Sequence, residues 1–99
     1  MDIKIHSVHF DADKKLIDFI ESKVSKLDQF YDNIIGAEVF LRLEKDQSPA
    51  NKVAEIRIQI PGSDLFAKKQ ADTFEESTDS AVNALRKQLT KRKAKQRGL

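Results

Sequence analysis

Cysteine is absent from this 99-residue sequence, as is tryptophan. Without cysteine the chain cannot form a disulfide, a thiolate metal site or a cysteine nucleophile. Its three glycines, at positions 36, 62 and 98, lie too far apart to build a glycine-rich phosphate-binding loop. No apolar run approaches the roughly 20 residues that a transmembrane helix needs. The alternating residues after Met1 also differ from a signal peptide. We therefore expect no membrane contact and a cytoplasmic protein.

Groups suited to catalysis or metal binding are also few. His6 and His9 are the only histidines, and a spacing of three places them on opposite faces of a strand, where they cannot share a metal. No serine has the glycine-elbow context of a hydrolase nucleophile. The carboxylates lie among lysines on predicted helix surfaces. We expect a protein that is not an enzyme and that has no cofactor, no metal and no small-molecule substrate.

Charge is strongly segregated along the sequence. Residues 1–79 carry 11 basic and 16 acidic residues, a formal charge of −5, whereas residues 80–99 carry seven basic residues and no acidic one. Such a basic segment is either a solvated terminus or a surface that binds an anion, of which nucleic acid is the commonest large example.

Hydrophobic periodicity predicts two helices and four strands. Apolar residues at spacings of three and four predict a helix from Lys14 to about Tyr31, which Asp13 would cap. The same spacing predicts a second helix, with a core face as far as Leu89, after a capping-box pattern from Asp72 to Glu75. Alternation predicts strands at 2–10, 37–44, 53–60 and 65–71. In the first strand the alternation slips between Ser7 and Phe10, which indicates an end or a bulge there.

This element order defines a fold class. Three consecutive strands with short links form an antiparallel meander, and a right-handed crossover through the first helix makes the first strand parallel to the second. We expect an α+β fold: a two-layer β-α-β-β-β-α sandwich with a four-stranded mixed sheet and both helices on one face, resembling the double-stranded-RNA-binding-domain fold. The chain would be a single domain, 1–99, whose basic tail leaves the sheet after Leu89 and frays from about residue 91.

The predicted first helix sorts its charges to two flanks. Lys23 and Lys26 lie with Phe19 on one side of the apolar stripe, and Asp18 and Glu21 lie on the other. A second basic strip therefore joins the basic end of the last helix in one layer, which favours RNA binding over a merely solvated terminus. Because the sheet offers few aromatic residues for stacking, we expect structured RNA bound through its backbone.

Three segments stand out together by order and spacing: Asp72-Thr73-Phe74, the run from Leu85 to Lys93, and the first-helix stretch from Lys23 to Tyr31. They resemble the ribosome hibernation-promoting factor and ribosome-associated inhibitor family in its short form, over essentially the whole chain. That family has Asp-Met-Tyr at the first segment and a Leu-x-x-Gln-Leu-x-Lys-x-Lys run at the second. Departures are Glu75 and Glu76, where the family usually has small residues, and Ile17, where some members carry arginine.

The resemblance implies a translation inhibitor without catalysis. It would bind the rRNA of the small ribosomal subunit in the decoding channel, block tRNA and mRNA binding, and stabilise idle ribosomes under stress or in stationary phase. The small ribosomal subunit would be its partner, without DNA, and the free protein would be monomeric. The residues expected to contact RNA phosphates are Lys23, Lys26, Arg86, Lys87, Lys91, Arg92, Lys93, Lys95 and Arg97.

An alternative function stays open from the sequence. The basic helix would also suit a protein-interaction module that meets an acidic partner, or a general structured-RNA-binding module that is not specific to the ribosome. A complex that survives RNase treatment would indicate a protein partner.

Overall fold

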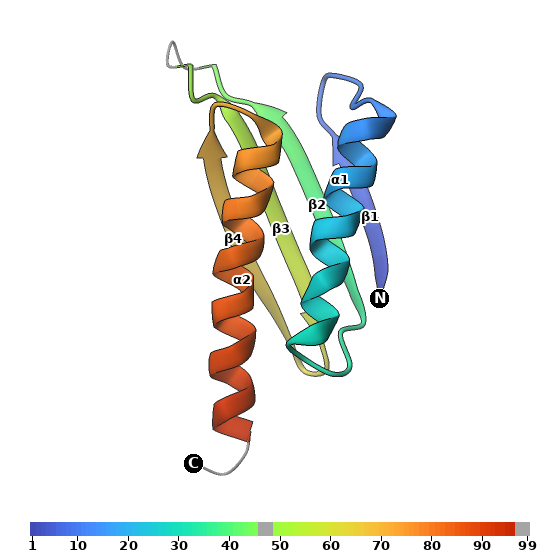
Figure 1. Cartoon of the computed structure of the whole chain (residues 1–99), viewed down its shortest axis with the longest axis vertical. Helices are drawn as coiled ribbons and strands as arrows, with labels where there is room; N and C mark the ends of the chain where they lie inside the picture. Colours follow the sequence, from blue (N-terminus) through green and yellow to red (C-terminus); the bar gives the residue numbers. More distant parts are fainter. Residues whose placement is uncertain (46–48, 97–99) are drawn as a thin grey trace.

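The computed structural model describes residues 1–45 and 49–96. Its elements are, in chain order, β1 (Asp2–Ser7), α1 (Lys14–Ser25), the 3₁₀-helix η1 (Lys26–Gln29), β2 (Gly36–Leu43), β3 (Lys52–Ile60), β4 (Ser63–Ala71) and α2 (Phe74–Gln96). The four strands form one sheet in the order β1-β2-β3-β4, and the two helices lie side by side on one of its faces (Figure 1). The predicted α+β architecture is confirmed.

Strand directions follow the predicted topology. β1 pairs with β2 in parallel, whereas β2 with β3 and β3 with β4 pair antiparallel. Pro61 and Gly62 form the two-residue connection between β3 and β4, where Gly62 has φ of +79°. Proline sets the first turn position and glycine accepts the positive φ of the second, which is the pattern of a type II turn.

Both helices begin at capped residues. The backbone N–H of Leu16 donates to Asp13 Oδ1 at 2.8 Å, so the predicted cap of α1 is confirmed. At α2 the cap is Thr73, one residue later than the predicted Asp72, because the Glu76 N–H donates to Thr73 Oγ1 at 3.1 Å. The threonine hydroxyl therefore satisfies an amide that would otherwise lack a partner in the first turn.

The first strand ends where its alternation slips, and the first helix ends earlier than predicted. β1 stops at Ser7, and His9 has φ of 66°, a left-handed conformation that is incompatible with a continuing strand. The first helix, predicted to reach about Tyr31, changes at Lys26 into the tighter η1. The turn so formed still buries Leu27 and Tyr31.

The hydrophobic core lies between the sheet and the helix layer. α1 and η1 contribute a buried stripe of aliphatic side chains, and α2 contributes Leu85 and Leu89, both fully buried against the sheet. The alternating aliphatics of β2 and β3 supply the other wall, except that Leu43, at the end of β2, is 48% exposed. Other members of the core are Ile20, Val24, Leu27, Val39, Leu41, Ile56, Ile58 and Ala81.

α2 is longer than its core face. It continues as a helix to Gln96, beyond the end of the sheet (Figure 1), where the sequence predicts fraying from about residue 91. The basic residues up to Lys95 are therefore carried on a helix. In the described ranges no helix combines the length and the apolar character needed to span a bilayer.

Candidate nucleic-acid interface

The open face of the sheet has charges that neutralise one another. Arg57 donates a hydrogen bond to Glu38, and Arg42 forms an ion pair with Glu55. Nε2 of His6 lies 3.2 Å from Glu38 Oε2. The hydrogen bond from Arg57 lowers the pKa of Glu38 below its ordinary value, with a smaller contribution from His6, against partial burial that raises it. The two arginines of this face are thus engaged before any ligand arrives.

On the opposite face, Lys23 and Asp79 mark where α1 meets α2. Lys23 occupies the last turn of α1, and its Nζ lies 3.3 Å from Asp79 Oδ1 of α2 and 5.6 Å from the centroid of the Phe19 ring. Asp79 is the last acidic residue of the chain. Every charged side chain that follows it along α2 is basic. We call the line along which α1 and α2 meet the seam; α2 is acidic before Asp79 and basic after it along this seam.

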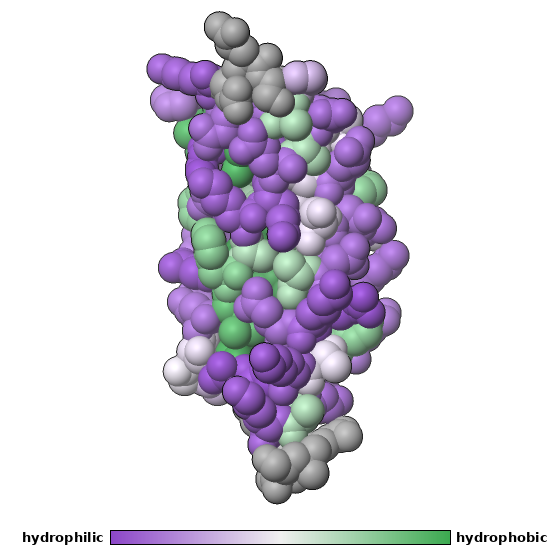
Figure 2. All heavy atoms as spheres, turned by 90° about the vertical axis from the view of Figure 1, so that its left-hand side faces the viewer, coloured by the Kyte–Doolittle hydropathy of each residue, from purple (hydrophilic) through white to green (hydrophobic). Residues whose placement is uncertain are grey.

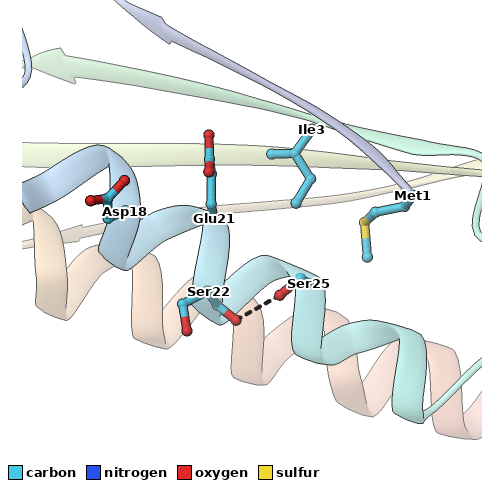
Figure 3. A pocket seen from close by; sticks show the side chains of 6 residues that line it. All are labelled: Met1, Ile3, Asp18, Glu21, Ser22 and Ser25. Carbon is cyan, nitrogen blue, oxygen red and sulfur yellow. Dashed lines mark hydrogen bonds between the residues drawn. The ribbon is translucent and has the colours of Figure 1, made fainter. Parts of the chain in front are cut away.

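The other flank of α1 has the opposite character. A hollow of about 450 Å³ lies between this flank and β1. Figure 3 shows the side chains that line it. The predicted sorting of charge is confirmed, since Asp18 and Glu21 line this hollow whereas Lys23 faces α2. Asp28 also lies toward β1, 3.6 Å from the amino group of Met1. An anion would therefore be repelled from the β1 side and attracted to the α2 side.

Three lysines form one exposed line along α2. Lys87, Lys91 and Lys95 recur every fourth residue, so they lie on the same side of the helix, and all three side chains are exposed. In the described part of the chain none has an acidic partner within ion-pair distance. Hydrophilic side chains cover this end of the molecule in the view onto the β4 side (Figure 2). We refer to these three residues as the lysine line.

Compared with the lysine line, Arg86 and Lys93 lie on a side of α2 that is closer to α1. The guanidinium carbon of Arg86 is 5.7 Å from the centroid of the Phe30 ring, a cation–π geometry that fixes the arginine over the end of η1. Lys93, two turns later, is half-buried and lines a hollow of about 300 Å³ with Phe30. Within residues 1–45 and 49–96, neither cation is ion-paired.

Arg92 differs from its neighbours. It continues the stripe of Leu85 and Leu89, as the sequence predicts, and its Nε is buried without a hydrogen-bond partner among the described residues. The expectation that the helix leaves the packed part of the fold directly after Leu89 is wrong at Arg92 and Lys93, because both are half-buried. Long basic side chains can pack their apolar stems against a core, and in Arg92 the burial extends to Nε.

The remaining predicted residues are Lys26 and Arg97. Lys26 begins η1 and is exposed, on the α1 side of the seam. Arg97 lies outside the described residues. The helix layer thus gathers the other eight predicted residues, with Lys23 the only one held by a carboxylate in the described ranges.

Sequence reasoning did not select the uncharged residues that accompany these cations. Phe30 and Gln29 at the end of η1, with Thr90 of α2, line the hollow beside Lys93. The signal was present, because an aromatic residue follows the basic strip of the first helix, but its nearness to α2 depends on the tertiary packing. The structure supplies no group of three or more potential metal ligands in its described ranges.

Comparison with known proteins now decides the family. The family model described as Sigma 54 modulation protein / S30EA ribosomal protein matches residues 3–97. The chain belongs to this family. The resemblance to ribosome hibernation-promoting factors drawn from the sequence is confirmed. This family is one of hibernation factors and not of enzymes, in agreement with the prediction from the sequence.

Individual relatives and solved structures match nearly the full chain. The ribosome hibernation promoting factor of Pseudomonas putida (strain KT2440) is 27% identical over 99 residues, which cover 100% of this chain and 93% of that protein. The N-terminal domain of Thermus thermophilus Protein Y superposes with a TM-score of 0.79 at 25% identity, covering 92% of this chain and 98% of that one. A ribosomal subunit interface protein from Coxiella burnetii has a TM-score of 0.84 at 23% identity, covering 95% and 99%.

Proposed function

We propose that this protein is a ribosome hibernation factor that binds the rRNA of the small ribosomal subunit in the decoding channel through its helix layer. While bound, it excludes tRNA and mRNA, silences translation under stress or in stationary phase, and stabilises idle ribosomes. Occupancy alone is the mechanism, so no catalytic step is involved. Residues 1–99 act as one ribosome-binding unit, monomeric when free, in the cytoplasm where ribosomes work.

One contrast between the two faces supports this assignment most directly. Among the described residues, the two arginines of the sheet face are bound to Glu38 and Glu55, whereas the cations that follow Asp79 on α2 have no carboxylate partner. Unpaired cations can neutralise phosphates without first breaking an ion pair. The helix layer, and not the open sheet, is therefore the better surface for a polyanion.

The geometry also assigns roles within this surface. The lysine line offers exposed ammonium groups along one helix, and Lys26 adds another from η1. Arg86, Arg92 and Lys93 are partly fixed by packing, so they would set the position of the RNA backbone. Arg97 is proposed as a further phosphate contact at the end of the chain. The name of the Pseudomonas putida relative agrees with a ribosomal target.

Co-sedimentation and translation assays test the proposal. The protein should co-sediment with isolated small subunits at low salt and inhibit a cell-free translation reaction. Each phosphate contact should steepen the fall of log affinity with log salt by about 0.7–0.9. If translation is unaffected at a several-fold excess of the protein over ribosomes, the proposal fails. Survival of the complex after RNase digestion would indicate a protein partner instead.

A pair of charge-matched variants makes the test specific to the surface. K87Q/K91Q/K95Q removes the lysine line, and because these side chains are exposed the fold should persist. K4Q/K68Q/K69Q removes the same charge from exposed lysines of the sheet strands. Only the first variant should lose subunit binding and translation inhibition. Equal losses in both would show that net charge, and not the helix layer, accounts for binding.

A further inference from the structure

The hollow between the end of η1 and the last turns of α2 has features that phosphate binding alone does not require. Its volume is about 300 Å³, and its lining residues are Gln29, Phe30, Thr90, Lys93 and Ala94. Phe30 packs partly against the core and also forms a wall of the hollow, so its ring is held in place while part of it stays accessible. A fixed and partly accessible aromatic ring beside cations is an arrangement that single-stranded nucleic acid uses for stacking.

The polar groups around the ring are suited to a nucleotide. Arg86 lies over the Phe30 ring at 5.7 Å, and Lys93 lies beside it without an acidic partner in the described ranges. The Thr90 hydroxyl donates to the Arg86 carbonyl at 2.9 Å, which leaves its lone pairs free to accept a hydrogen bond. The Gln29 amide offers both donors and an acceptor, so it can pair with the edge of a base.

We propose that this hollow receives one unpaired RNA base, stacked on Phe30, with the flanking phosphates held by Arg86 and Lys93. The inference rests on the proposed binding to rRNA and names the kind of nucleotide that the surface selects. A base inside a duplex cannot enter, because both of its faces are covered by its neighbours. A bulged or looped nucleotide presents its face and edge freely.

The charge of the lining decides between an RNA base and an apolar peptide side chain. Lys93 is the one charged residue among those that line the hollow in the described ranges, and the nearby Arg86 over the Phe30 ring is also basic. A peptide would leave the two cations without counter-charges, whereas a nucleotide brings its own phosphate to them.

The test measures the binding of the protein to two RNA hairpins of the same length. One has a single bulged 2-aminopurine, and the other has that base paired in the stem. Stacking on Phe30 should change the fluorescence of the bulged 2-aminopurine, and the protein should bind the bulged hairpin about 5- to 150-fold more tightly than the paired one. Equal affinity for both hairpins, or an unchanged fluorescence, overturns the inference.

Two matched variants locate the effect. F30L keeps an apolar side chain but removes the ring, so it should lose the preference for the bulge. F19L makes the same change at the second cation–aromatic contact, where Lys23 lies 5.6 Å from the ring outside the hollow, and should keep the preference. A preference that survives in F30L, or is lost in both variants, rules the hollow out.

Different experimental outcomes would reject the proposed function and this inference. F30L retains the lysine line, so it should still co-sediment with small subunits at low salt even though the bulge preference is gone. Retained co-sedimentation without any bulge preference in the parent protein would reject the base site and leave the ribosomal function standing. Loss of co-sedimentation by the parent protein would reject the ribosomal function itself.

Discussion

Nζ of Lys23 lies 3.3 Å from Oδ1 of Asp79, so a lysine predicted to bind RNA is held by the last carboxylate of the chain. This ion pair bridges α1 and α2 at the edge of the basic surface. Both side chains are partly exposed, and pairs of this kind stabilise a fold by about 0.2–1 kcal/mol. The pair therefore costs little to break, and under the proposed function RNA phosphates would compete directly with Asp79 for the lysine.

Asp79→Asn is accordingly expected to strengthen RNA binding. The change frees Lys23 for a phosphate and removes a repelling charge from the seam. The slope of log affinity against log salt should steepen by up to about 0.9, and the free energy of unfolding should fall by no more than about 1 kcal/mol. Fluorescence anisotropy of a labelled RNA across a salt series measures the slope.

Asp64→Asn provides the control for net charge. Asp64 is an exposed carboxylate at the start of β4, and it forms no ion pair in the described ranges. If D64N strengthens RNA binding as much as D79N does, the effect arises from net charge and the role assigned to the Lys23–Asp79 pair is incorrect.

The sequence was sufficient to predict the fold because its periodicities are regular. The alternation of apolar residues in β2 and β3 matches a strand, and the spacing of three and four residues that ends at Leu89 matches a helix. The connections between these elements then allow one topology. Element ends were predicted less well. The change to η1 at Lys26 and the left-handed His9 arise from packing and local backbone geometry, which apolar spacing does not encode.

The sequence predicted which basic residues form the candidate site, but not the contacts that these residues make in the fold. Counting basic residues identified the surface, whereas the packing of Phe30 under Arg86 and the burial of Arg92 depend on how η1 meets α2. Residues about 56 positions apart along the chain meet there, and no local pattern specifies that contact. The Lys23–Asp79 pair could not be predicted from the sequence for the same reason, because its two residues are far apart along the chain.

Thr73→Ala should destabilise the protein by about 1 kcal/mol, because the Thr73 hydroxyl accepts from the Glu76 N–H in the first turn of α2. Thr73→Ser should restore most of that stability, since the hydroxyl is retained. Asp72→Ala should have little effect, because the structure assigns the cap to Thr73. Urea unfolding of the three variants measures the differences, and a larger loss in D72A than in T73A would place the cap one residue earlier.

Acid should weaken the fold partly through Glu38. Its pKa is lowered by the hydrogen bond from Arg57, from an ordinary value of 4.5. The ionised carboxylate therefore stabilises the folded state above the unfolded pKa, and this contribution disappears as the pH falls through the lower, folded pKa. Glu38→Gln cannot ionise, so the difference in unfolding free energy between E38Q and the parent should be largest near neutral pH and should shrink in acid.

Two further variants check that the acid dependence comes from this pair. Arg57→Gln removes the hydrogen-bond donor and should flatten the acid side of the stability profile as E38Q does. Lys68→Gln removes an exposed cation from the same face of the sheet and should keep the parent profile. Chemical denaturation at a series of pH values gives all three curves. An unaltered profile in R57Q would show that Arg57 is not the cause of the shift.

Leu89 and Lys91 should separate folding from binding. Leu89 is fully buried and is the last core residue of α2, so Leu89→Ala should lower the free energy of unfolding by about 2–5 kcal/mol. Its remaining folded fraction should bind RNA nearly as the parent does, since no phosphate contact is removed.

Lys91→Ala should instead weaken RNA binding while changing stability by less than about 0.5 kcal/mol, because its side chain is exposed. Urea unfolding and RNA anisotropy, measured on both variants, give the comparison. A K91A variant with unchanged affinity would remove Lys91 from the interface, and one that unfolds as readily as L89A would show that the lysine line supports the core.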